Sequence, residues 1–215
     1  MHLIHRGIVN KRYKENLLKS FKQSFEKGYG IETDIHATKD GEFICFHDFT
    51  LKRTFKKNLS IKNLNYSKIN AISTKYNKPI PFLKDLLKCS KNRYPMHIEI
   101  KPILSKFLLK KLLKETSKFT KSVFISFKHK NIYNLLKIKK NIKVGLSFSP
   151  PTSIKNIIKK SNNKNISCLI LDKSYLKNKN IQNLKIEKYY YTIKTKSEFN
   201  KYNKNNNLIF ENLFF

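Results

Sequence analysis

Two carboxylates and a histidine alternate along one short segment of the chain. Glu32, Asp34 and His36 are separated by single residues within a largely apolar run at positions 31–38. Successive side chains of a β-strand point to opposite faces, so these three would share one face. Carboxylate oxygens are the ligands that Mg²⁺ and Ca²⁺ prefer. The spacing indicates a site for a hard divalent cation; the alternative is the solvent-exposed polar face of an edge hairpin.

A hairpin would bring a second histidine to these carboxylates. Asp40-Gly41 follows the run, and another apolar run comes next at 42–47. An Asp-Gly pair between two such runs is typical of a two-residue hairpin turn. With that turn, Asp34 would lie directly opposite His47.

Other chemically useful side chains end apolar runs elsewhere. His5-Arg6 closes the first run of the chain, and Glu99 and Lys101 close the run at 96–101. A carboxylate inside such an apolar strand needs a partner. Glu99 and Lys101 lie on the same side of the strand, because they are two residues apart.

Apolar runs alternate with lysine-rich segments of helical periodicity along the chain. Eight runs are predicted as parallel strands, at residues 3–5, 31–38, 96–101, 122–127, 143–148, 168–172, 188–193 and 207–211. This alternation predicts an α/β fold with a parallel sheet, and eight strands are the number that closes a (β/α)8 barrel. The carboxyl ends of the strands would open onto one face, where the polar side chains above would meet. We expect a single domain over residues 1–215.

Two parts of the chain depart from this alternation. Residues 48–81 have a weak pattern and are expected to be an insertion after the hairpin, with a short helix near 62–71. No helical segment follows the last strand, so the C-terminal end of the barrel is expected to be truncated. The seam between the first and last strands would then expose apolar surface. We expect the insertion or a partner subunit of a homo-oligomer to cover it.

These motifs, in this order and spacing, resemble the glycerophosphodiester phosphodiesterases, which are TIM barrels. The matching segments are His5-Arg6-Gly7, Glu15-Asn16, Ile31-Glu32-Thr33-Asp34-Ile35, Thr38-Lys39-Asp40-Gly41, His47-Asp48, Leu51-Lys52-Arg53-Thr54, Ile80-Pro81-Phe82-Leu83 and Ile98-Glu99-Ile100-Lys101. The chain departs from the family where the last strand commonly ends in an aspartate near a proline, because Glu211 stands there.

The resemblance implies metal-dependent hydrolysis of a glycerophosphodiester to glycerol 3-phosphate and an alcohol. It implies that one divalent cation, Mg²⁺ or Ca²⁺, is held by Glu32, Asp34 and Glu99. It implies that His5 and His47 form the acid/base pair, without saying which is which. It also implies that Arg6 and Lys101 bind phosphate oxygens.

Several further side chains stand near the expected site. The aromatic residues Phe127, Phe148 and Tyr191 end strands and are expected to line the pocket for the glycerol or its alcohol. Asn16 is expected to cap or position the first helix. His129 is expected at the surface.

The composition narrows the function class only in part. The chain has 46 Lys+Arg against 14 Asp+Glu, a formal net charge of +32. The lysines are spread along the whole length, whereas nucleic-acid modules concentrate charge on one face or tail, so no specific nucleic acid is expected. The charge would steer a small anionic substrate or an anionic membrane surface toward the protein.

Compartment and alternative functions follow from the same features. No apolar run reaches the roughly 18 residues that span a bilayer, and no signal peptide is recognisable, so the expected location is cytoplasmic. The first alternative is a phosphodiesterase directed at lysophospholipids on a membrane. The second is a non-catalytic basic barrel that binds phosphate or nucleic acid.

Overall fold

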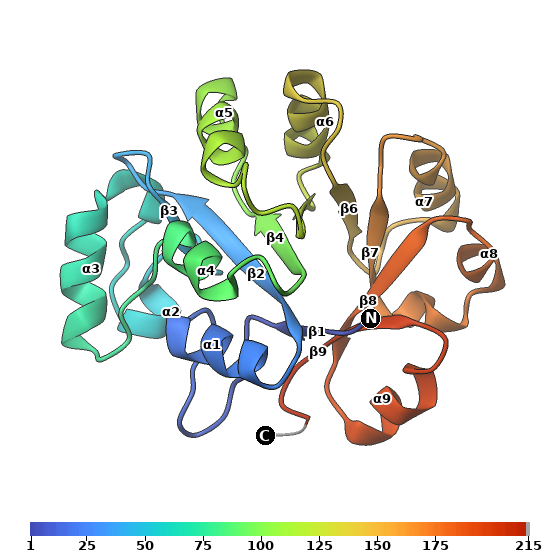
Figure 1. The fold of residues 1–215 in the computed structure, drawn as a ribbon, viewed down its shortest axis with the longest axis horizontal. Helices are drawn as coiled ribbons and strands as arrows, with labels where there is room; N and C mark the ends of the chain where they lie inside the picture. Colours follow the sequence, from blue (N-terminus) through green and yellow to red (C-terminus); the bar gives the residue numbers. More distant parts are fainter. Residues whose placement is uncertain (214–215) are drawn as a thin grey trace.

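Eight parallel strands close into a barrel in the computed structural model, which describes residues 1–213 (Figure 1). The strands are β1 (Leu3–His5), β2 (Gly30–Ala37), β4 (Met96–Ile100), β5 (Ser122–Ser126), β6 (Val144–Phe148), β7 (Cys168–Asp172), β8 (Glu187–Ile193) and β9 (Asn207–Phe210). Each strand pairs with the next, and β1 pairs with both β9 and β2, which completes the ring. The expected TIM barrel is confirmed.

Helices between the strands cover the outside of the barrel, as Figure 1 shows. They are α1 (Leu18–Glu26), α4 (Leu83–Ser90), α5 (Lys106–Glu115), α6 (His129–Ile138), α7 (Ile154–Ser161), the 3-10 turn η2 (Lys173–Lys177) with α8 (Lys179–Gln182), and α9 (Lys196–Tyr202). Helix α5 is typical, since it buries Leu109 and Leu112 and keeps its lysines outside. No helix within residues 1–213 is both long enough and apolar enough to cross a bilayer.

The inside of the barrel is filled by alternate side chains of the strands. They form an apolar cluster of Leu3, Ile125, Cys168, Ile170, Tyr189 and Ile209. Such a packed interior is a floor and not a pore, so a ligand can enter only at the mouth above it. The mouth lies at the carboxyl ends of the strands.

The hairpin is offset by one residue from the expected register. Strand β3 (Phe43–Cys45) pairs antiparallel with β2, and the Phe46 N–H donates to the Asp34 carbonyl at 3.0 Å. Phe46, and not His47, therefore lies opposite Asp34. The turn has three residues, 39–41, because Gly41 adopts a left-handed conformation (φ 75°) that glycine reaches without strain.

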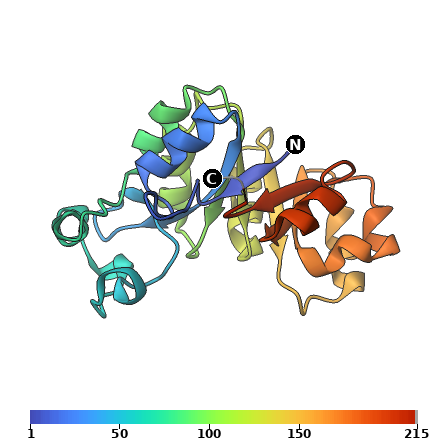
Figure 2. The ribbon, with the colours of Figure 1, turned by 90° about the horizontal axis from the view of Figure 1, so that it is seen from below.

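The insertion packs beside the barrel against β3. It contains α2 (Lys52–Phe55), the 3-10 turn η1 (Ile61–Asn63) and α3 (Tyr66–Lys75). Its side chains and those of β3 form a separate apolar cluster of Ile44, Phe46, Leu51, Phe55, Ile61, Ile69 and Ile80. Figure 2 shows the insertion at one side of the barrel, on the side away from α9.

The seam between β1 and β9 is closed by the helices that flank it. The Phe210 ring lies 5.1 Å from Phe199 of α9 and 5.4 Å from Tyr29, which follows α1. Phe210 is buried as a result. The expectation that the insertion covers this seam is wrong, because the insertion packs against β3 instead. The seam also needs no partner subunit to bury it.

Candidate active site

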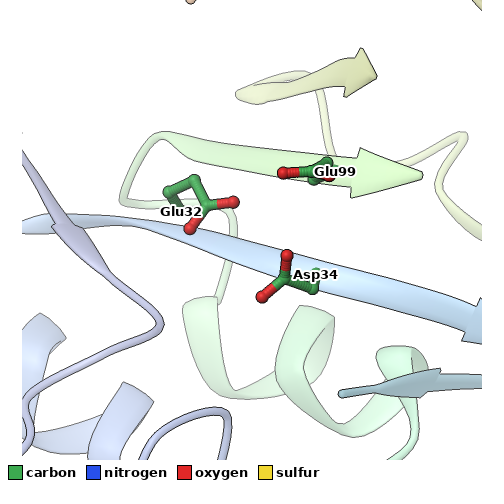
Figure 3. A group of neighbouring side chains, drawn as sticks. All are labelled: Glu32, Asp34 and Glu99. Atoms are coloured by element: carbon green, nitrogen blue, oxygen red, sulfur yellow. The ribbon is translucent and has the colours of Figure 1, made fainter. Parts of the chain in front are cut away.

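Three buried carboxylates meet at the mouth of the barrel. Glu32 and Asp34 share the inward face of β2, and Asp34 is in register with Glu99 on β4. Each offers an oxygen that lies within 4.8 Å of the oxygens offered by the other two (Figure 3). Their side chains face into the barrel and are buried, which excludes the solvated edge-hairpin alternative.

Two cations hold Asp34 in its ionised form. Arg6 Nε lies 3.0 Å from one Asp34 oxygen, and Lys101 Nζ lies 3.3 Å from the other. Burial alone would raise the pKa of Asp34, but the charges of Arg6 and Lys101 outweigh it and lower the pKa to about 2.

The other two carboxyls have the opposite shift. Burial, reinforced by the Asp34 charge, raises the pKa of Glu99 to about 7, although Lys101 Nζ is only 2.8 Å from Glu99 Oε1. Burial and the charges of Asp34 and Glu99 raise the pKa of Glu32 well above its usual value. The chain's own cations do not balance three carboxylates in this space.

The donor set fits a hard divalent cation. Among the described residues Glu32 Oε2 is buried without a hydrogen-bond partner. An orphaned carboxylate oxygen is costly unless something positive binds it. Three carboxylate oxygens within reach of one point are ligands suited to Mg²⁺ or Ca²⁺, with water completing the coordination.

His5 is oriented by a carboxylate from the other end of the chain. Its Nδ1 donates to Glu211 Oε2 at 2.8 Å, and its Nε2 lies 3.8 Å from Glu32 Oε2. The hydrogen bond from His5 lowers the pKa of Glu211 to about 2, with help from Lys194 Nζ at 3.0 Å. In the sequence, Glu211 was noted only because the family commonly has an aspartate near a proline at the end of the last strand. Its role could have been found from the adjacency of the first and last strands in a closed barrel.

His47 is oriented in the same way from the insertion. Its Nδ1 donates to Asp48 Oδ1 at 2.7 Å, and Arg53 Nε donates to Asp48 Oδ2 at 2.6 Å. Arg53 also binds Glu15, whose second oxygen lies 3.0 Å from an Arg6 nitrogen. A continuous chain of ion pairs therefore joins the two histidine-bearing segments.

His36 supports His47 through the backbone. Its Nε2 donates to the His47 carbonyl at 3.1 Å, and burial lowers the pKa of His36 to about 4, so it is neutral at pH 7. Burial also lowers the pKa of His47, against the opposing charge of Asp34. A neutral His47 can accept a proton near neutral pH.

Asn16 positions a carboxylate and does not cap the helix. Its Nδ2 donates to Asp34 Oδ2 at 3.1 Å, and its Oδ1 accepts from Thr33 Oγ1 at 2.8 Å. Helix α1 has no side-chain cap. The expected helix-capping role is therefore wrong. Asn16 instead donates to the Asp34 carboxylate and holds that side chain in place.

One cavity of about 210 Å³ contains the expected site. Its walls are His5, Arg6, Glu32, His47, Glu99, Lys101, Ile125, Phe127, Ile170, Tyr191, Thr192 and Ile209. Phe127 and Tyr191 line it as expected, with their rings in edge contact. Asp34 lies just behind its wall, bound to Arg6 and Lys101.

Two sequence expectations fail at β6 and α6. Phe148 lies outside the cavity and is only 2% exposed, because its side chain points to the helices and packs on His129. The inward positions of β6 are Gly145 and Ser147 instead. His129 is half-buried, not superficial, since its Nε2 donates to the Ser147 carbonyl at 2.9 Å.

A comparison with known protein families gives a match over most of the chain. The profile of the Glycerophosphoryl diester phosphodiesterase family matches residues 5–210. The chain belongs to this family.

Individual members of the family are more distant. A glycerophosphodiester phosphodiesterase of Caldanaerobacter subterraneus subsp. tengcongensis is 28% identical over 68% of this chain and 65% of its own length. A lysophospholipase D of Homo sapiens is 29% identical over 52% of this chain and 39% of its own. The alignments thus cover less than two thirds of these family members.

A solved phosphodiesterase structure has the same fold as this protein over nearly the whole chain. It is a phosphodiesterase of Oleispira antarctica in complex with the product sn-glycerol-3-phosphate. The TM-score is 0.82 at 18% identity, over 97% of this chain and 91% of that one. This likeness confirms the barrel architecture.

Replacing Glu211 with Gln is expected to lower kcat about 100-fold, with little change in KM, because His5 would lose the charged group that orients it. Steady-state kinetics on a glycerophosphodiester measures this. The Glu211→Asp variant should recover part of the activity. Glu187→Gln, at the opposite end of the barrel, is the matched control. Unchanged kcat in Glu211→Gln would show that this carboxylate contributes nothing to turnover.

Proposed function

We propose that the protein hydrolyses glycerophosphodiesters to glycerol 3-phosphate and an alcohol with a bound divalent cation. The observation that supports this best is the cavity itself. It joins a buried three-carboxylate cluster, two carboxylate-oriented histidines and two cations that can bind phosphate oxygens. Hydrolysis of a phosphodiester uses all three kinds of group, because charge on the phosphate oxygens must be neutralised and protons must be moved.

The cation would be held by Glu32, Asp34 and Glu99. When bound, it would neutralise negative charge on the non-bridging phosphate oxygens. Arg6 and Lys101 would bind the same oxygens, and the phosphate would then lie in the cavity that both histidines line. Both cations already lie against carboxylates, so the phosphate joins an existing charge network.

The histidines would move protons through their Nε2 atoms. In both rings Nδ1 is engaged by a carboxylate, from Glu211 for His5 and from Asp48 for His47. This fixes the tautomer with the proton on Nδ1 and leaves Nε2 as the acceptor. One histidine takes the proton of the attacking hydroxyl, which belongs to water or to the substrate's own glycerol. Attack by the glycerol hydroxyl would form a cyclic glycerol phosphate, and water would then open this ring to give glycerol 3-phosphate. The other, in its protonated form, gives a proton to the leaving alkoxide.

The rest of the cavity suits a small polyol. Ile125, Ile170 and Ile209 form its apolar floor, and the rings of Phe127 and Tyr191 form one wall. Apolar walls with few convergent polar groups are typical of small-molecule sites. We propose that these two rings contact the glycerol or the alcohol.

Release of glycerol 3-phosphate from glycerophosphocholine and glycerophosphoethanolamine tests the proposal. We expect turnover with Mg²⁺ or Ca²⁺ and a loss of about 100-fold or more after chelation, restored by adding the ion back. Turnover that survives complete chelation would contradict the metal requirement. Metal binding without turnover of either diester would favour a larger lipid substrate, and lysophosphatidylcholine is the second substrate to assay. Neither metal binding nor turnover would favour the basic binding barrel.

A further inference from the structure

Exposed apolar side chains gather around the mouth of the barrel. The large exposed hydrophobic residues among positions 1–213 are Met1, Leu18, Phe49, Leu59, Tyr76, Ile103, Phe107 and Phe127. We call Phe49, Ile103, Phe107 and Phe127 the mouth rim. Phe107 is 74% exposed, Ile103 58%, Phe49 53% and Phe127 37%.

The contacts of these residues place them at the same opening. Phe127 lines the catalytic cavity. The Phe49 ring lies 5.0 Å from His36, near the end of β2. Ile103 and Phe107 lie in the segment that follows β4. Because parallel strands open at their carboxyl ends, all four surround the entrance that the substrate must use.

Packing does not account for the rim. Helix α5 buries Leu109 and Leu112, while Phe107, near the start of the helix, stays outside. A single exposed apolar residue is ordinary, but several around one functional opening mark an interaction surface.

The loops that carry Ile103, Phe107 and Phe127, together with the loop after β6, are basic, whereas Phe49 follows the acidic Asp48. Segments 101–110, 127–131 and 149–156, which follow or end β4, β5 and β6, contain six lysines and no acidic residue. Segments at the opposite end, such as 117–121 and 139–143, are basic too. Charge therefore gives general attraction to an anionic surface, and the apolar rim decides which end of the barrel approaches it.

We propose that the mouth rim docks on an anionic phospholipid bilayer, with the catalytic cavity facing the lipid. The rim side chains would enter the headgroup region, and the surrounding lysines would bind anionic headgroups. A bilayer fits this surface better than a protein partner does. A protein seated on the rim would close the cavity entrance, whereas a membrane can supply or receive a phosphodiester there. The rim also consists of side chains on separate loops.

Vesicle co-sedimentation of the full chain tests the docking without any turnover. The probe is vesicles of equal parts phosphatidylcholine and phosphatidylglycerol, compared with pure phosphatidylcholine. We expect binding to the anionic vesicles that weakens with salt. The Ile103→Ser/Phe107→Ser variant should bind about tenfold more weakly. Neither residue belongs to the catalytic cavity, so hydrolysis of a soluble diester should be unchanged in this variant and serves as the folding control.

A pair of charge variants separates the rim from general basicity. Lys106→Gln/Lys110→Gln removes two charges beside the rim, and Lys139→Gln/Lys140→Gln removes two exposed charges at the opposite end. The first pair should weaken binding to anionic vesicles more than the second does. Equal losses, or equal binding by the Ile103→Ser/Phe107→Ser variant and the wild type, would overturn the proposal. Loss of a dimer in that variant, with vesicle binding unchanged, would assign the rim to a second copy of the chain.

The outcome of the docking test does not depend on the outcome of the activity test. Vesicle binding requires no catalysis, so an inactive protein that docks through the rim would still support this inference. An active protein that ignores anionic vesicles would overturn the docking and leave the proposed reaction intact.

Discussion

Asn at position 34 is expected to abolish tight divalent-cation binding and to lower turnover by about 100- to 1000-fold. Asp34 is the carboxylate that Arg6 and Lys101 keep ionised, so it gives the cation a full negative charge at any physiological pH. In the Asp34→Asn variant Arg6 and Lys101 would lose their shared partner and would repel the incoming ion. Titration calorimetry with Mg²⁺ and Ca²⁺, beside steady-state turnover, measures both effects.

A matched control makes this result specific. Asp85→Asn removes a carboxylate from the first turn of α4, outside the barrel, and should leave metal binding and turnover close to those of the wild type. Wild-type metal affinity in Asp34→Asn would show that the cation, if any, binds elsewhere.

The pH dependence of the same site is a second readout. A carboxyl whose folded pKa is raised stabilises the fold at low pH, and this contribution is lost as the pH rises through the folded value. Burial raises the pKa of Glu99 to about 7 and that of Glu32 in the same direction. The metal-free protein should therefore lose stability from about pH 5 to about pH 8, and an added divalent cation should restore it most at the alkaline end. Thermal unfolding with and without the ion measures this difference.

Loss of either histidine is expected to lower kcat by about 100- to 10 000-fold. The proposed mechanism needs one imidazole to accept a proton and the other to donate one, so neither His5→Gln nor His47→Gln should retain appreciable turnover. His129→Gln is the control, because His129 packs outside the cavity against Phe148.

The leaving group distinguishes the two roles. A p-nitrophenyl ester of glycerol phosphate has a leaving group that needs little protonation. Turnover of this ester should recover in the variant that lacks the general acid and stay low in the variant that lacks the base. Recovery in both variants, or near-normal turnover of the natural diester in either, would contradict the acid/base pair.

Local spacing accounts for much of what the sequence predicted. The alternation in residues 31–38 placed Glu32 and Asp34 on one face, and the eight apolar runs predicted the barrel. The closeness of Glu99 to Asp34 was expected from the meeting of strand ends and from the family resemblance. Its atomic basis is the β2–β4 register, which pairs the two residues directly.

The predictions that were wrong concern features that the spacing of residues along the chain does not determine. The hairpin register depends on the backbone conformation of Gly41, which adds a third residue to the turn. The phase of a strand decides whether an aromatic side chain points inward, so Phe127 and Tyr191 reach the cavity whereas Phe148 does not. Asp48 and His47 are neighbours in the sequence, but the Arg53–Glu15–Arg6 chain behind Asp48 depends on how the insertion packs.

His5 and Glu211 are separated by 206 positions, yet they share one hydrogen bond. That contact forms only when β9 has docked against β1, and β9 is the last of the described strands to be synthesised. Non-local contacts of this kind are slow to form and arise late in folding. A nascent chain therefore contains the strands that carry the three carboxylates, β2 and β4, and the Arg6 that binds Asp34, well before it contains the partner that orients His5. Alignment of His5 would then report completion of the barrel, and partly made chains would hold the carboxylate cluster beside an imidazole that nothing orients.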